Sequence, residues 1–375
     1  MELSNEDSLR LNVLINQDLQ AVRIDESKMI VHALTGRGEA KVPLNPNCRD
    51  DKYLRIVREL FSTHALGSPG GYPVYLRRWT RMGEVREESL QGLLLLGEPE
   101  AIVAVANSPK LSEEVARRAW WAMPDADIAR RMLNNPQIAG SDIGRELAAF
   151  LLEFLPFETE ARYIVDSVRL VLQPGLVDDA TVQGLWSRAA RKSAYYIGFL
   201  LASPERLPET APANPAYDEV EAALQGLAAD NPYAEKLLQL FSAEGQAFLS
   251  TVNKAMEKLS DQYVVVLFLA AIQNFFRDIN PVTGAKYRSF EEIHTTVEQA
   301  FNDQTNGKLR EISDTAPHLR EALASMLALS EVCESLVDPI FSQTDAVGSV
   351  MRKRLQPVTQ PIDEHIQRLV RQANS

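Results

Sequence analysis

The chain has 375 residues, of which 45% are hydrophobic and 24% are charged, values typical of a soluble globular protein with two or three domains. Its two cysteines, Cys48 and Cys333, are too few for a disulfide framework and predict a reducing, cytoplasmic compartment. The net charge of −12 is concentrated in residues 207–375, which hold 14 Lys and Arg against 23 Asp and Glu. This acidic balance disfavours nucleic-acid binding by the whole chain.

Residues 1–66 predict a small α+β module. Hydrophobic residues alternate with period two over 20–25, 29–34 and 39–44, and the last two runs flank the sequence Gly36-Arg37-Gly38. This spacing predicts a β-hairpin within a three-stranded meander. Amphipathic patterns predict two helices, over 6–15 and 52–65, and the second can be capped by Asp50 or Asp51. The acidic N-terminus has no apolar stretch behind it, so we expect no signal peptide.

Residues 67–202 predict a HEAT-like array of short helices, because proline, glycine or asparagine interrupts each helical pattern. Pro109 and Pro124 bracket one such helix, and Asn135-Pro136 begins the next pattern. Stacked short helices of this kind usually form a surface that holds partners. The predicted helices cover 75–82, 87–95, 98–106, 112–122, 125–133, 141–154, 158–172 and 178–201.

The proline-rich segment 203–216 predicts a domain linker, and residues 217–375 predict a helical bundle. The most apolar run, 264–272, belongs at the centre of this bundle, because spanning a bilayer takes roughly 20 apolar residues. We therefore expect no membrane span. The predicted fold is mostly α, with its bundle helices over 217–228, 233–259, 261–279, 290–303, 317–340, 345–355 and 361–372.

Three segments of the sequence resemble the DsrS family of dissimilatory sulfur-oxidising bacteria. The resemblance is carried by residues 67–83, which read GSPGGYPVYLRRWTRMG, by 119–124, which read AWWAMP, and by 3–12. The resemblance extends over the full chain, and it implies a soluble cytoplasmic protein encoded with the reverse-acting dissimilatory sulfite reductase system. Members of the family are linked to oxidation of stored sulfur without an assigned reaction. The resemblance therefore implies a pathway and supplies no active-site residues.

Cys48 is a candidate sulfur carrier. It lies just before a predicted helix and beside Arg49, and both a helix N-terminus and a guanidinium stabilise a thiolate. Asp50 and Asp51 oppose this effect, and most lone loop cysteines are unreactive surface thiols. Cys333 has helical spacing with apolar neighbours and is expected in the core.

Arginines recur on consecutive predicted helices and could form a partner-binding face. If the helices stack in register, these side chains would meet an acidic protein or an RNA backbone. The alternative is an ordinary solvated face whose charge is offset by neighbouring acids. The candidate residues are Arg77, Arg78, Trp79, Arg117, Arg118, Arg130 and Arg131.

The sequence predicts no catalytic, metal or cofactor site. Glu291 and His294 form one Glu-x-x-His pair, but a di-iron site needs two such pairs, and His365 follows Asp363 and Glu364 with a different spacing. Motifs for zinc proteases, redox dithiols, serine hydrolases and phosphate-binding loops are absent from the sequence.

We therefore expect a protein that is not an enzyme and that acts by contacts with other proteins, as a cytoplasmic accessory or regulator of dissimilatory sulfur oxidation. One alternative is a thiol-dependent sulfur carrier that uses Cys48. A second alternative is an RNA-linked post-transcriptional regulator that uses the basic face of the helical array.

Overall fold

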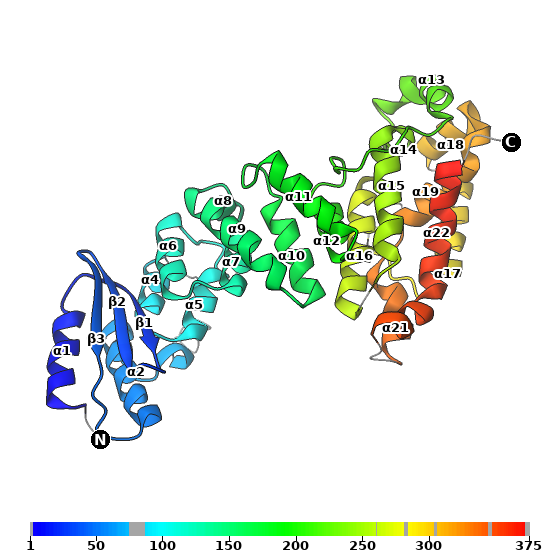
Figure 1. Cartoon of the computed structure of the whole chain (residues 1–375). Coiled ribbons are helices and arrows are strands. Elements are labelled where there is room, and N and C mark those ends of the chain that lie inside the picture. Colours follow the sequence, from blue (N-terminus) through cyan, green and yellow to red (C-terminus); the bar gives the residue numbers. More distant parts are fainter. Residues whose placement is uncertain are drawn as a thin grey trace. The chain divides into compact units, whose positions relative to one another are not determined.

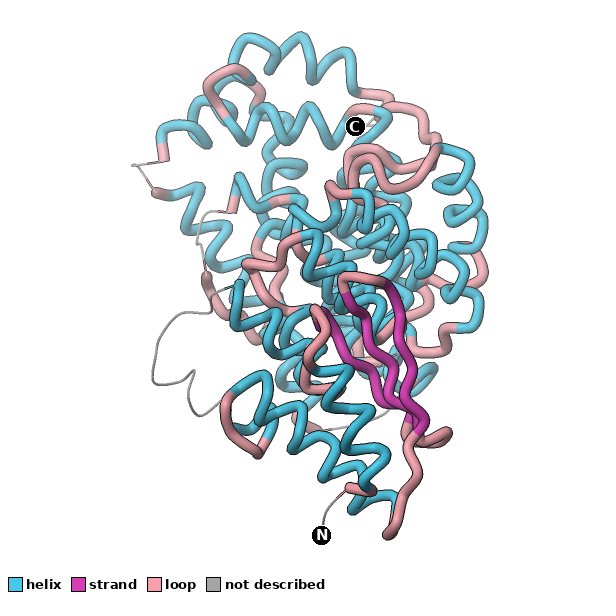
Figure 2. Tube along the Cα trace, turned by 90° about the vertical axis from the view of Figure 1, so that its left-hand side faces the viewer, coloured by secondary structure: helices cyan, strands magenta, loops and turns pink. Residues whose placement is uncertain are grey.

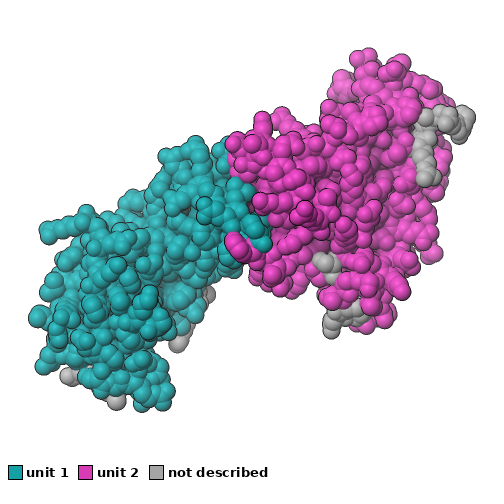
Figure 3. Space-filling model, viewed as in Figure 1, with its two compact units in different colours: residues 1–156, 174–176 teal, residues 157–173, 177–375 magenta. Residues whose placement is uncertain are grey.

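The chain forms a mostly helical structure with a small antiparallel sheet near the N-terminus, as predicted. The computed structural model describes residues 3–74, 87–259, 261–280, 284–303, 306–343 and 347–371 (Figure 1). It divides into two compact units, coloured separately in Figure 3. Unit 1 comprises residues 1–156 and 174–176, and unit 2 comprises 157–173 and 177–375. The predicted helix over 75–82 lies outside the described residues.

The sheet of unit 1 is the predicted meander. Strands β1 (Leu19–Asp25), β2 (Ile30–Thr35) and β3 (Gly38–Pro43) pair antiparallel in the order β1-β2-β3 and run side by side in Figure 2. Alternate residues such as Val31 and Ala33 are fully buried in a core shared with α1 (Asn5–Ile15) and α2 (Asp50–Leu66). The period-two pattern of the sequence therefore sets which face of each strand is buried.

The sheet also packs against the helices that follow it, and residues 1–66 belong to the same compact unit as these helices. The Trp121 indole lies under the Arg23 guanidinium, 5.2 Å from it, and its Nε1 donates a hydrogen bond of 2.7 Å to Glu39. This contact joins the end of α6 to β1 and β3. The helices of this part of unit 1 are α4 (Glu87–Leu94), α5 (Pro99–Ala106), α6 (Glu113–Ala122), α7 (Ala126–Leu133), α8 (Pro136–Ala139) and α9 (Asp142–Phe154).

The lengths of these helices do not support the predicted HEAT-like repeat. The shortest of them, α8, has four residues, whereas α9 has 13. Asn135 caps α8 by accepting a hydrogen bond from the Gln137 N–H at 3.0 Å, and Pro136 occupies its first turn. The proline punctuation therefore sets helix starts without producing units of equal length.

Unit 2 contains the predicted helical bundle. The apolar helix α16 (Gln262–Phe275) packs against α12, α15 and α19, and α22 packs on α15 and α19 (Figure 1). Phe248 of α15 stacks on Phe275 with 3.7 Å between ring centroids, which places an aromatic contact in the centre of the bundle. Besides α16, the α-helices of this part of the chain are α10 (Ala161–Val171), α11 (Asp179–Ala189), α12 (Ala194–Ala202), α13 (Tyr217–Ala228), α14 (Pro232–Phe241), α15 (Ala243–Met256), α17 (Phe290–Asn302), α18 (Gly307–Thr315), α19 (Arg320–Ser330), α20 (Asp338–Phe341), α21 (Gly348–Arg354) and α22 (Gln356–Arg371). Short 3-10 turns are η1 (Leu155–Phe157), η2 (Arg277–Ile279), η3 (Pro317–Leu319) and η4 (Glu334–Val337).

The predicted linker 203–216 lies inside unit 2, so the predicted division of the helical region at this segment differs from the observed one. Asn214 is 3% exposed, and its side-chain nitrogen donates a hydrogen bond of 2.9 Å to the Leu369 carbonyl. Its backbone N–H donates to the Phe241 carbonyl at 2.8 Å. Proline interrupts a helix, but these hydrogen bonds pack the interrupted segment against the bundle.

Two long predicted helices are each divided into two. The predicted helix 233–259 is interrupted at Ser242, whose hydroxyl accepts from the Gly245 N–H at 3.3 Å and begins α15. A side chain at Gly245 would place its Cβ 2.0 Å from the Gln239 carbonyl oxygen, so the turn requires glycine. The predicted helix 178–201 is interrupted near Ser193, which is buried and donates to the Lys258 carbonyl at 3.0 Å.

The close approach of α10 and α12 gives a test of this packing. A Cβ at Gly198 would lie 2.7 Å from the Val168 side chain, so Gly198→Ala should lower the free energy of unfolding by about 1–3 kcal/mol through overpacking. Gly184→Ala is the matched control, because Gly184 lies in α11 with open space around it. This variant should gain up to about 1 kcal/mol from helix propensity. Urea unfolding measures both values, and equal effects of the two substitutions would contradict the proposed close packing.

Candidate functional site

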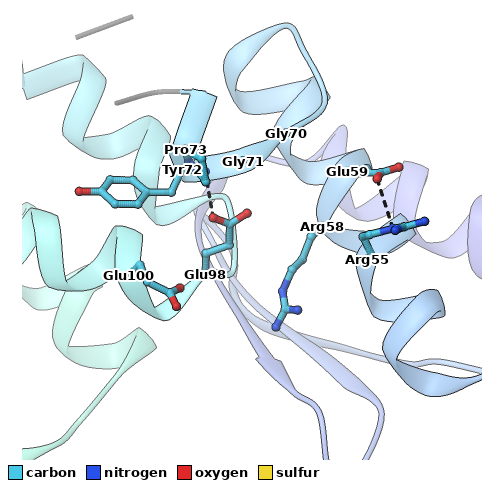
Figure 4. Close-up of a pocket in the computed structure, with 9 residues that line it drawn as sticks. All are labelled: Arg55, Arg58, Glu59, Gly70, Gly71, Tyr72, Pro73, Glu98 and Glu100. Atoms are coloured by element: carbon cyan, nitrogen blue, oxygen red, sulfur yellow. Dashed lines mark hydrogen bonds and ion pairs between the residues drawn. The ribbon is translucent and has the colours of Figure 1, made fainter. Parts of the chain in front are cut away.

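A cavity of about 470 Å³ in unit 1 is the candidate binding site (Figure 4). Its walls come from three segments that are distant in the sequence: α2, the glycine-rich loop that follows α2, and the start of α5. The lining residues are Arg55, Arg58, Glu59, Gly70, Gly71, Tyr72, Pro73, Glu98 and Glu100.

The glycine-rich loop is held in place by hydrogen bonds to both neighbouring segments. The buried Ser62 hydroxyl donates to the Ser68 carbonyl at 2.8 Å and accepts from the Gly71 N–H at 2.9 Å. The Glu98 carboxylate accepts from the Tyr72 N–H at 2.9 Å. Gly71 has φ +60°, and a Cβ there would lie 2.0 Å from a Glu98 carboxylate oxygen. Residue 71 therefore needs glycine both for its backbone conformation and for the approach of Glu98.

Opposite charges line the two sides of this cavity. Arg55 and Arg58 extend from α2, whereas Glu98 and Glu100 come from the start of α5 (Figure 4). Arg55 lies 3.6 Å from Glu59, and Arg58 forms an ion pair with Glu26. The Arg58 Nε is buried and has no hydrogen-bond partner in the described part of the chain.

Glu100 is exposed, and it forms no ion pair or hydrogen bond with the residues that the structure describes. The cavity thus offers the Glu100 carboxylate on one wall and the partly exposed Arg58 guanidinium on the other, although the buried Nε of Arg58 is itself out of reach of a ligand. These groups suit a ligand that carries charges of both signs. The charged residues of this site are separated by about 40 positions in the sequence, so no local pattern predicts that they line one cavity. The glycine cluster 67–71 was the signal that could have located it.

The arginines predicted to form a partner-binding face are mostly neutralised within their own helices. Arg117 pairs with Glu113 at 2.7 Å, Arg118 pairs with Glu114, and Arg131 pairs with Asp127 at 2.7 Å. Each acid precedes its arginine by four residues, which is the favourable orientation of such a pair on a helix. These pairs leave little net positive charge on this face, and the contact role of these arginines stays a prediction.

The remaining residues of this predicted face are Arg130, Arg77, Arg78 and Trp79. Arg130 is only 8% exposed, because most residues of the short helix α7, Arg130 included, are buried. The prediction that Arg130 contributes an exposed charge is therefore wrong. Arg77, Arg78 and Trp79 lie outside the described residues.

The neighbouring tryptophans have structural contacts. Trp120 is 8% exposed, donates a 2.9 Å hydrogen bond from Nε1 to Glu146, and packs edge-on against Phe150. Trp121 contacts the sheet through Arg23 and Glu39, as described above. Both indoles therefore hold α6 in place within unit 1.

The two cysteines lie in different environments. Cys48 is half-buried just before α2, packs against the core of the α+β region, and has its Sγ 3.7 Å from the Arg49 carbonyl oxygen. The Arg49 guanidinium, which was expected to stabilise a thiolate, pairs with Asp51 at 3.1 Å. Cys333 is buried, as predicted, and lies 3.1 Å from the Ser335 hydroxyl.

In unit 2 the structure brings together two histidines that the sequence left separate. His294 of α17 and His365 of α22 meet with 2.9 Å between their Nε2 atoms, so one imidazole donates a hydrogen bond to the other. His365 is 4% exposed and stacks on Phe290. Burial, together with the charges of His294 and Arg368, lowers the pKa of His365 to about 3. The pair is therefore held in a form in which His365 is neutral.

Within the described ranges, no cluster of three or more His, Cys, Asp or Glu side chains is arranged to hold a metal ion. None of the described helices combines the length and the apolar character needed to cross a membrane.

Comparison of the chain with protein-family models, with curated proteins and with solved structures found no match.

Iodoacetamide should distinguish the two cysteines. We expect alkylation of native protein at Cys48 and protection of the buried Cys333 until the protein is unfolded. Peptide mass spectrometry measures each site, and Cys48→Ser should abolish the labelling of the native protein. Comparable labelling of Cys333 in the native protein would show that its surroundings are not closed.

The buried histidine predicts acid sensitivity. The pKa of His365 is lower in the folded protein than its ordinary value of 6.5, so the unfolded chain binds the extra proton. Its contribution to stability is present above pH 6.5 and is lost as the pH falls from 6.5 toward 3. The loss is at most about 1.4 kcal/mol per pH unit.

Urea unfolding between pH 4.5 and 7.5 measures this slope. His365→Leu should reduce the slope, because leucine carries no titratable group. His64→Gln is the matched control, because His64 is exposed in the last turn of α2 and this variant should keep the slope of the parent protein. An unchanged slope in His365→Leu would assign the acid sensitivity to another group.

Proposed function

We propose that this protein is a non-catalytic accessory protein that binds another protein through the cavity of unit 1. The observation that carries the proposal is the placement of arginines and glutamates on opposite walls of that cavity, around a loop in which Gly71 allows the close approach of Glu98. A polypeptide segment presents both charges and free backbone groups, so it can satisfy both walls at once.

The same charges argue for a protein partner and against a nucleic acid. A phosphate backbone has only negative charge, and it would meet Glu98 and Glu100 at the cavity. The opposing arginines are already partly neutralised by Glu26 and Glu59. A volume of about 470 Å³ lies within the range of ligand-binding pockets and would admit a few side chains of a partner.

The resemblance of residues 67–83 to the DsrS family supplies the pathway part of the proposal. The glycines that shape the cavity, Gly70 and Gly71, belong to that segment. We therefore place the proposed partner in the cytoplasmic, reverse-acting dissimilatory sulfite reductase system. In this proposal the protein holds or regulates a component of sulfur oxidation and transforms no substrate.

The two alternatives have less support. A sulfur carrier needs a thiolate at Cys48, but the nearby Arg49 guanidinium is engaged by Asp51. An RNA-binding regulator needs a basic face, but Arg117, Arg118 and Arg131 are each paired with an acid on the same helix. The mixed-charge cavity fits neither of these activities as well as it fits a polypeptide.

Charge reversal within the cavity tests the proposal with purified reverse-acting dissimilatory sulfite reductase. The double variant Arg55→Glu with Glu100→Lys keeps the net charge, so it changes local complementarity and leaves long-range attraction nearly unaltered. We expect it to raise the Kd, measured by calorimetry, by at least about tenfold, which is 1.4 kcal/mol.

The matched control is Arg145→Glu with Glu153→Lys, which makes the same exchanges on the exposed face of α9. This control should bind like the parent protein. Equal affinity of the cavity variant and the parent would move the interface elsewhere, and absence of any binding would overturn the assignment of the partner.

A further inference from the structure

Unit 2 has a second cavity, of about 330 Å³, between the start of α17, the turn η4 with α20, and the junction of α21 and α22. Its apolar lining includes Phe290, Leu336 and Val358, which are at most 6% exposed. The Phe290 ring stacks on the buried His365 ring, which limits its movement. This wall is therefore a firm apolar surface that can receive a hydrocarbon chain or ring.

Two arginines, Arg288 and Arg354, line the same cavity. Neither guanidinium forms an ion pair or a hydrogen bond with the part of the chain that the structure describes. The described lining residues include no Asp or Glu.

The turn that carries Arg288 is fixed by a capping box at the start of α17. The Ser289 hydroxyl accepts from the Glu292 N–H at 3.4 Å, and the Glu292 carboxylate accepts from the Arg288 N–H at 2.8 Å. Glu292 thus binds the backbone of Arg288 and forms no ion pair with its guanidinium. The cap holds the residue in position while its side-chain charge stays available.

We propose that this cavity binds a small amphipathic anion, with a carboxylate or phosphate head and an apolar chain or ring. Guanidinium groups bind carboxylate and phosphate oxygens with paired hydrogen bonds, which fixes the head at Arg288 and Arg354. The apolar body lies against Phe290, Leu336 and Val358, where it leaves water. This site belongs to unit 2 and is independent of the protein contact proposed for unit 1.

Calorimetry with octanoate and octyl phosphate tests the site, with octanol and octylamine as probes that keep the chain and lose or reverse the charge. Both anions should bind at least about tenfold more tightly than octanol, and octylamine should not bind measurably. The tighter of the two anions identifies the head group that the arginines prefer. Binding of octanol as strong as that of octanoate would overturn the proposal, as would absence of binding by both anions at millimolar concentrations.

Variants that each remove one positive charge show which residues contact the anion. Arg288→Gln and Arg354→Gln should each weaken octanoate binding by about five- to tenfold, whereas Lys353→Gln should leave it unchanged. Lys353 is the matched control because it is exposed, lies next to Arg354 on α21 and does not line the cavity. Circular dichroism confirms that each variant folds. An equal loss of affinity in all three variants would show that general electrostatic attraction causes the binding, and it would overturn the proposed site.

Discussion

The absence of a side chain at residue 71 is the constraint on which the cavity of unit 1 depends. Because Gly71 has no Cβ, the Glu98 carboxylate can reach the Tyr72 N–H and hold the glycine-rich loop against the start of α5. Ser62 binds the other side of the loop and connects it to α2. The positions of the arginines and glutamates across the cavity follow from these two attachments.

The two cavities differ in the way their charges are compensated. In unit 1 each arginine at the cavity has an acidic partner, and further carboxylates stand opposite. This arrangement favours a partner that carries both signs of charge. In unit 2 the arginines face apolar side chains, which favours an anion attached to a hydrocarbon body. The two proposals thus assign two kinds of recognition surface to one chain, and neither of them requires a reactive group of the protein.

Contacts between distant residues also explain why the observed units differ from the predicted domains. Trp121 binds Glu39, 82 positions earlier, and thereby makes the sheet and the first helices one unit. Asn214 binds the Leu369 carbonyl, 155 positions later, and places the proline-rich segment within the bundle. Proline and glycine mark where a helix stops, but they carry no information about what the interrupted segment packs against.

The sequence by itself determined the local structure. Alternation predicted three strands that begin and end within a residue or two of β1, β2 and β3, and prolines and caps located most helix starts. Such features depend on neighbouring residues, through backbone sterics and capping hydrogen bonds. Only the tertiary structure decided that His294 meets His365 and that Arg55 and Arg58 line the same cavity as Glu98 and Glu100. These juxtapositions depend on how the elements pack against one another, because burial in three dimensions, and not sequence spacing, brings those side chains together.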